Sequence, residues 1–229
     1  MELDGARVLV AGATGELGGA LATALLDKGA KVVPGGRDEQ RLQDLAERCG
    51  TEPVRYDAVD VDSCREAVDA AADQLGGLDA VVVTVGNAGF GSALDTDAAV
   101  TEELFAVNTL GPISLVRAAA PHLSEKGTVA VFSAILADMP TAGMADYSAA
   151  KSALSVWLQV LRRENRKKLR VLDIRPPHLD TGLEQRALGG DPPKMPDAMP
   201  AEKVIEQVIE ALAGDATEIK MDGGKLVTT

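Results

Sequence analysis

The pair of residues best suited to do chemistry in this chain is Tyr147 and Lys151. They stand four positions apart in a segment predicted to be helical, so both side chains would lie on one face. A tyrosine ordinarily titrates near pH ~10, and a nearby ammonium favours its ionised form and lowers its pKa. A tyrosine tuned in this way can protonate a forming alkoxide, or deprotonate an alcohol in the reverse direction. An isolated Tyr-x-x-x-Lys pair is more often a pair of solvent-exposed side chains on a surface helix. The other motifs of the chain must therefore decide whether this pair is catalytic.

A glycine-rich turn near the N-terminus has the form of a nucleotide-binding loop. A strand-like run, Val8–Ala11, leads into this turn, and an apolar helical pattern follows it. Glycines permit a tight turn and a close approach of the backbone, and free N–H groups at the start of the helix favour a pyrophosphate. A merely structural turn is the alternative. The residues expected to contact a dinucleotide here are Gly12, Thr14, Gly15, Leu17 and Gly18.

The end of the second predicted strand bears on the choice of dinucleotide. An acidic residue there would bind the ribose 2′-hydroxyl and favour NAD, whereas this chain has Gly35-Gly36-Arg37. The planar guanidinium of Arg37 can pair with a 2′-phosphate. NADP(H) is therefore predicted over NAD, with a solvated arginine beside Asp38 as the alternative.

Strand-like and helical segments alternate along the chain, which predicts βαβ units and a mostly parallel sheet. We expect a Rossmann-like, doubly wound α/β fold with about seven strands. No linker or repeat divides the chain, so one domain should cover residues 1–229, with 176–200 as a substrate loop or, alternatively, a solvated connector. Strands are expected near 6–11, 31–33, 54–56, 79–85, 128–132, 170–174 and 218–221. Two of the helices are expected near 101–123, with Gly111-Pro112 as the place for a break, and near 145–168.

Composition argues against several other classes of protein. The net charge of −12 disfavours binding to nucleic acid or to an anionic membrane surface. No apolar stretch is long enough to span a bilayer and the N-terminus is acidic, so we expect a cytoplasmic protein. The two cysteines, Cys49 and Cys64, have neither a zinc spacing nor a disulfide pattern, so no metal is expected.

Several separated motifs, in order, resemble the short-chain dehydrogenase/reductase superfamily in its single-domain branch. The resemblance runs from residue 6 to about residue 181. It implies an NADP(H)-dependent oxidoreductase that interconverts a ketone or aldehyde and an alcohol by hydride transfer. It also implies a homodimer or homotetramer. Besides the glycine turn and the Tyr147–Lys151 pair, the matching motifs are Asp57, Asn87-Ala88-Gly89, Asn108, Ser133 and Arg175-Pro176.

The resemblance also implies a role for each motif. Tyr147 would be the acid/base, and Lys151 would tune it and contact the nicotinamide ribose. Ser133 would hydrogen-bond the substrate carbonyl, and Asn108 would hold a water that links Lys151 to solvent. The cofactor site would be completed by Asp57, Ala58, Asn87, Pro177 and Thr181.

Three positions depart from the family pattern and bear on cofactor affinity. Glu16 stands in the phosphate turn where glycine is usual, Gly86 replaces the first of two asparagines, and Pro177 replaces a glycine. His178, at the start of the 176–200 segment, could contact substrate. Two other functions stay open: a cofactor-sensing regulator without turnover, and an isomerase or lyase such as the epimerases whose glycine pattern this turn resembles. The epimerases usually need a larger C-terminal region.

Overall fold

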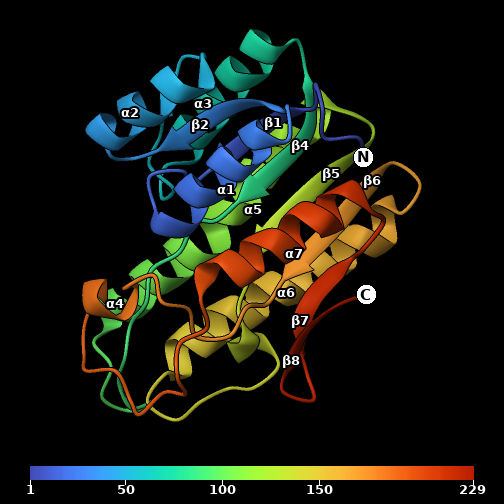
Figure 1. Cartoon of the computed structure of the whole chain (residues 1–229). Coiled ribbons are helices and arrows are strands. Elements are labelled where there is room, and N and C mark those ends of the chain that lie inside the picture. The colour runs from blue at the N-terminus through green and yellow to red at the C-terminus, as the bar shows by residue number, and fades with distance from the viewer.

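The computed structural model describes all residues 1–229 and shows one eight-stranded sheet with helices on both faces (Figure 1). The strand order is β3-β2-β1-β4-β5-β6-β7-β8, and every neighbouring pair is parallel except the last. The doubly wound, mostly parallel α/β fold is therefore confirmed. The strands are β1 (Arg7–Ala11), β2 (Lys31–Gly36), β3 (Val54–Arg55), β4 (Leu78–Val83), β5 (Leu123–Phe132), β6 (Leu169–Ile174), β7 (Glu218–Asp222) and β8 (Lys225–Thr228).

The helices form two layers that bury the apolar faces of the sheet. Alternate residues of β1 enter opposite layers: Val8 and Val10 pack toward α1 and α7, while Leu9 and Ala11 pack toward α3, α5 and α6. This two-sided burial explains why the central strands read as continuous apolar runs. The helices are α1 (Glu16–Asp27), α2 (Glu39–Cys49), α3 (Val61–Leu75), α4 (Ala98–Phe105), α5 (Gly111–Ala119), α6 (Ala145–Asn165) and α7 (Ala201–Ala213).

The structure differs from the expected elements in three places. The strand expected over 128–132 is β5, which already begins at Leu123. An eighth strand, β8, pairs antiparallel with β7 through a turn at Gly223 and Gly224, both with positive φ. The expected helix 101–123 is divided into α4, a π-helical turn at Ala106–Leu110, and α5, which begins at the expected break near Gly111-Pro112. The π-turn lies where the chain passes close to another segment: a Cβ on Gly111 would lie 2.6 Å from the Ala58 carbonyl oxygen.

The 176–200 segment is mostly irregular, but backbone hydrogen bonds hold it against the rest of the domain. Leu188 donates to the carbonyl of Ala88, and Phe90 donates to the carbonyl of Gly189. Figure 1 shows this segment, in orange, at the same end of the molecule as α4. Because all parallel strands end at this edge, the sheet and the segment enclose one region. No helix in the chain combines the length and apolar character needed to cross a membrane.

Candidate active site

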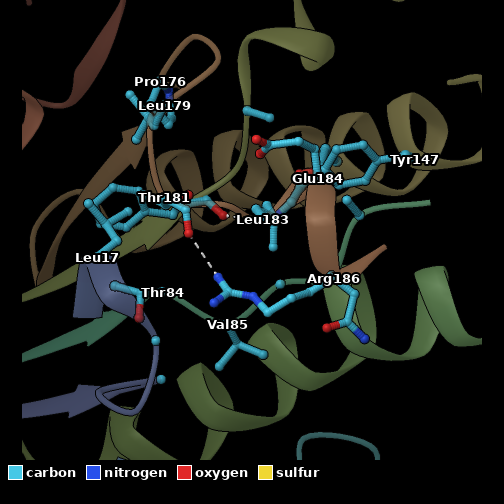
Figure 2. A pocket seen from close by; sticks show the side chains of 18 of the residues that line it. Leu17, Thr84, Val85, Tyr147, Pro176, Leu179, Thr181, Leu183, Glu184 and Arg186 are labelled. Carbon is cyan, nitrogen blue, oxygen red and sulfur yellow. Dashed lines mark hydrogen bonds between the residues drawn. The ribbon is translucent and has the colours of Figure 1, made fainter. Parts of the chain in front are cut away.

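A cavity of about 720 Å³ lies at the carboxyl edge of the sheet and brings most of the predicted site residues together. Figure 2 shows Leu17, Thr84, Tyr147 and Thr181 around it, contributed by segments far apart in the sequence. Every residue predicted to bind cofactor or to do chemistry lines this cavity except Asn108, which is fully buried behind it. The fold therefore brings these separate sequence motifs to one edge of the sheet.

The glycine turn has the shape and the free backbone groups that a pyrophosphate needs. A Cβ on Gly12 would lie 2.5 Å from the Thr84 hydroxyl, and one on Gly18 would collide with the Gly12 carbonyl, so the turn packs tightly. Gly15, in contrast, meets only the Gly12 carbonyl at 3.4 Å and opens to the cavity. Gly15 is also the N-cap of α1 and gives the helix no side-chain cap. The N–H groups at the start of α1 therefore remain available for an anion, and the turn fits a dinucleotide.

Two arginines and one glutamate lie at the far side of this turn. Arg37 lines the cavity, and no hydrogen bond or ion pair engages its side chain. Arg41, one turn further along, donates to the Thr14 carbonyl at 2.9 Å and lies 3.6 Å from the Glu16 carboxylate. Asp38 accepts from the Arg41 backbone N–H and so caps α2. Arg41 was missed by the sequence analysis, although its place one helical turn after Arg37 was a usable signal.

Tyr147 and Lys151 lie on the buried face of α6, as the four-residue spacing predicts. Burial raises the pKa of Tyr147 to about 12. Burial lowers the pKa of Lys151 to about 8, although the negative charge of Asp173 raises it in part. The Lys151 ammonium donates to the Phe132 carbonyl at 3.0 Å. The expected lowering of the Tyr147 pKa by Lys151 is not found, because desolvation dominates the environment of the phenol.

Asn108 ties the π-turn to the segment that follows β4. Its amide donates to the carbonyls of Asn87 and Leu104, each at 3.0 Å, and its oxygen accepts from the Asn87 N–H at 3.1 Å. Gly86 permits this approach: a Cβ there would lie 2.9 Å from the Asn108 oxygen and 3.1 Å from the Lys151 ammonium. The departure from the family pattern at Gly86 therefore leaves room for Lys151 and Asn108.

Ser133 is not arranged as a free donor to a substrate carbonyl. Its hydroxyl donates to the Asp173 carboxylate at 2.5 Å, and a hydroxyl has only one proton to donate. Ala134, the next residue, also lines the cavity but offers only a methyl group. The expected carbonyl contact thus requires the bond to Asp173 to break first.

Asp173 is the centre of a buried polar network beneath the cavity that the sequence analysis missed. Its carboxylate also accepts from the Ser155 hydroxyl at 2.6 Å and from Arg175 at 2.8 Å. Arg175 in turn pairs with Asp138 and Glu218 at 2.9 and 3.0 Å. A buried carboxylate needs such partners. A lone acidic residue inside the apolar run of β6 was the signal in the sequence.

Comparison with known proteins agrees with this architecture. The sequence profile described as short chain dehydrogenase matches residues 6–189. The chain is 29% identical to a solved short chain dehydrogenase from Burkholderia cenocepacia in complex with NADP, with a TM-score of 0.82, and the match covers 98% of this chain and 99% of that one.

Several curated relatives carry hydroxysteroid dehydrogenase names, among them the following two. The chain is 36% identical over 170 residues to hydroxysteroid 11-beta-dehydrogenase 1-like protein of Macaca fascicularis, and this alignment covers 71% of this chain and 59% of that protein. The chain is 31% identical over 195 residues to 11-beta-hydroxysteroid dehydrogenase A of Sesamum indicum, and this alignment covers 80% of this chain and 55% of that protein. The chain thus matches less than two thirds of the length of either relative.

Proposed function

The chain belongs to the short-chain dehydrogenase/reductase family, and we propose that it is an NADP(H)-dependent oxidoreductase interconverting a ketone or aldehyde and an alcohol. One observation carries the proposal: Tyr147 and Lys151 share a cavity with the open glycine turn at the N-terminus of α1. A proton donor and a nucleotide-binding turn at one cavity suit a reaction that moves a hydride and a proton together.

The choice of NADP(H) over NAD rests on the charges beside the end of β2. Arg37 has its guanidinium free at the cavity, and Arg41 lies one turn away. Asp38 caps α2, which gives its carboxylate a use other than binding a ribose hydroxyl. A 2′-phosphate would thus meet two guanidinium groups. The NADP-bound relative from Burkholderia cenocepacia is consistent with this choice.

The proposed mechanism uses the protein mainly for binding and proton transfer. NADP(H), when bound, would supply or take up the hydride. Tyr147 would give its phenolic proton to the developing alkoxide in reduction, and Lys151, as an ammonium, would stabilise the resulting tyrosinate. Asn108 would hold a water behind Lys151 through which the proton is replaced. The remaining residues of the predicted cofactor site would bind the adenine and nicotinamide ends: Asp57, Ala58, Asn87, Pro177 and Thr181.

A cofactor-sensing regulator is the second candidate, and one observation favours it. The Ser133 proton is already given to Asp173, so the cavity lacks the carbonyl donor that the family resemblance implies. A regulator would bind NADPH without turning over any carbonyl compound. The retention of both Tyr147 and Lys151 at the cavity favours the enzyme.

We also propose that the chain forms a homodimer or homotetramer through the surface near α6. Large apolar side chains stay exposed there: Val156 is 58% exposed, Val160 44%, and Leu110, on the adjoining π-turn, 59%. Covering such a patch with a second copy would remove apolar surface from water. Light scattering of the purified chain measures the assembly directly.

The test of the proposed function is a fluorescence titration with NADPH and NADH, followed by turnover of a panel of ketones and aldehydes. Tight NADPH binding with NADPH-dependent turnover supports the enzyme. Binding without any turnover supports the regulator. If neither nucleotide binds, both functions are wrong.

A further inference from the structure

The wall of the cavity opposite the sheet carries a polar pair that the proposed mechanism does not use. The Nε2 atom of His178 and the Oε2 atom of Glu184 are each buried, and neither has a hydrogen-bond partner. They lie 3.7 Å apart, which is too far for a hydrogen bond between them. Both residues line the cavity that holds Tyr147 (Figure 2 labels Glu184). Buried polar groups are normally satisfied, so an unpaired couple at a cavity wall calls for an explanation.

The surrounding contacts fix the orientation of the imidazole and its protonated nitrogen. His178 Nδ1 lies 3.0 Å from the Pro196 carbonyl oxygen, which can only accept, so Nδ1 carries a proton. The backbone of the same residue accepts from Met199 N–H, and the Asp180 carboxylate caps α7 through Ala201 N–H. In the neutral ring, Nε2 therefore presents a lone pair from a well-anchored position.

No lysine or arginine pairs with Glu184, and the nearest group that can carry a positive charge is the imidazole of His178, 3.7 Å away. Arg186, on the same short helical turn, donates to the Thr181 carbonyl at 3.0 Å instead (Figure 2). When the imidazole is neutral, His178 Nε2 and the Glu184 carboxylate form two adjacent hydrogen-bond acceptors. The cavity also has apolar lining residues, alongside the charged Arg186, Lys194 and Asp197: Phe90, Leu136, Met139, Met144, Leu183 and Met195. In such surroundings an unmet acceptor is costly and a matching donor is strongly preferred.

We propose that His178 and Glu184 are specificity-determining residues that bind a hydrogen-bond donor, a hydroxyl or an amino group, on an otherwise apolar carbonyl substrate. This inference rests on the proposed oxidoreductase function and adds the substrate class to it. The donor would sit between Nε2 and Oε2, away from the carbonyl that reacts at Tyr147. A hydroxyl would donate to the carboxylate, and an ammonium would donate to both acceptors and also meet the charge.

The experiment measures NADPH-dependent turnover of medium-chain 2-alkanones of graded length, each compared with its analogues that carry a terminal hydroxyl or a terminal amino group. For the length that spans the cavity, we expect a donor-bearing analogue to have a KM roughly tenfold below that of the plain alkanone. A lower KM for the amino analogue identifies the charge of Glu184 as the dominant attraction. A lower KM for the hydroxyl analogue identifies hydrogen bonding.

Three variants separate recognition from a structural role. Glu184→Gln removes the charge at nearly constant shape, and His178→Asn keeps a donor near the Nδ1 position for Pro196 while removing Nε2. Both should abolish the preference for donor-bearing analogues and leave kcat for the plain alkanone and the affinity for NADPH unchanged. His178→Gln, the matched control, places an amide near the Nε2 position and should retain part of the preference.

Two results would overturn the inference while leaving the proposed function intact. One is turnover of plain and donor-bearing ketones with equal KM by the wild type. The other is a preference that survives both substitutions, or an equal loss for all substrates together with a lower Tm, which would mark the pair as structural. If the protein neither binds NADPH nor reduces any carbonyl compound, the proposed function fails, and this inference fails with it.

Discussion

The Ser133 hydroxyl donates its proton to the buried Asp173 carboxylate across 2.5 Å, just beyond the end of β5. Asp173 is fully buried, and Ser155 and Arg175 supply its other contacts. A hydrogen bond to a buried carboxylate is among the stronger ones a serine can make. The hydroxyl therefore belongs to the interior network more than to the cavity.

This bond predicts that Ser133→Ala will have a small effect on catalysis. Loss of a hydrogen-bond donor to a developing oxyanion ordinarily lowers kcat by about 10²–10³. We expect kcat/KM to fall by less than about tenfold, while the free energy of unfolding falls by about 1–2 kcal/mol because Asp173 loses a donor. Steady-state kinetics and urea denaturation measure the two effects. A fall in kcat of about 10²–10³ at unchanged stability would instead show that Ser133 donates to the substrate carbonyl.

Tyr147→Phe should remove the proton donor and keep the cavity. Proton transfer by a positioned side chain contributes about 10²–10⁴ to the rate, so kcat should fall by that range. The affinity for NADPH, followed by fluorescence, should be unchanged because the ring remains. Tyr56→Phe is the matched control, since Tyr56 is the other tyrosine and is also buried at the cavity. Equal losses in the two variants would contradict the role of Tyr147.

The sequence was sufficient to predict the order of the first seven strands, the main helices between them and the residues at the cavity edge. Those predictions depend on local patterns: apolar runs in β1 and β4, the glycine turn, and the spacing of Tyr147 and Lys151. Parallel topology then carries residues after each strand to one edge, so separate motifs converge without further information.

What the sequence could not supply was the direction in which particular side chains point. Whether Ser133 faces the cavity or the interior depends on Asp173, forty residues away, and on Arg175 beside it. The pKa of Tyr147 depends on burial, which three-dimensional packing determines. The strand β8 was missed because a short edge strand depends on its pairing with β7 rather than on its own composition.

Because Arg37 and Arg41 are proposed to bind the 2′-phosphate, loss of Arg37 should weaken the binding of NADPH and not that of NADH. A charge-assisted contact is worth about 1.5–3 kcal/mol, so Arg37→Ala should raise the Kd for NADPH by roughly tenfold or more. The Kd for NADH, which lacks the 2′-phosphate, should be unchanged. Arg48→Ala, on the exposed far end of α2, is the matched control. A parallel weakening of both nucleotides would argue that Arg37 acts on the fold of the turn.

At Gly86 we expect that even one added methyl group lowers both stability and activity. An added Cβ would press on both the Lys151 ammonium and the Asn108 oxygen. Because Lys151 is held by the Phe132 carbonyl, the side chain has little freedom to retreat. Overpacking of this kind costs about 1–3 kcal/mol, so Gly86→Ala should lower the Tm and kcat together. Gly76→Ala tests backbone strain alone, since a Cβ there meets nothing within 4 Å at a φ of +71°.

Because Lys151 is buried, the free energy of unfolding should rise with pH over the range in which its ammonium loses its proton. Burial lowers its pKa from 10.5 to about 8, so between these values the unfolded chain binds more protons than the folded one. Stability should therefore rise with pH across that window, and below pH 8 the buried charge costs at most about 3 kcal/mol. Lys151→Met removes the charge and should be more stable than the wild type near neutral pH by about 1–3 kcal/mol, while losing activity.

The difference between the two proteins isolates this one group, since the other titrations largely cancel between them. Urea denaturation of both, from neutral pH to above pH 10, should show the advantage of Lys151→Met shrinking toward zero as the wild-type ammonium loses its proton. In the same range the rate of carbonyl reduction by the wild type should fall, because neutral Lys151 no longer stabilises the tyrosinate formed at Tyr147. A stability difference that stays constant with pH would show that Lys151 titrates at the same pH in the folded and the unfolded chain, so that burial does not lower its pKa.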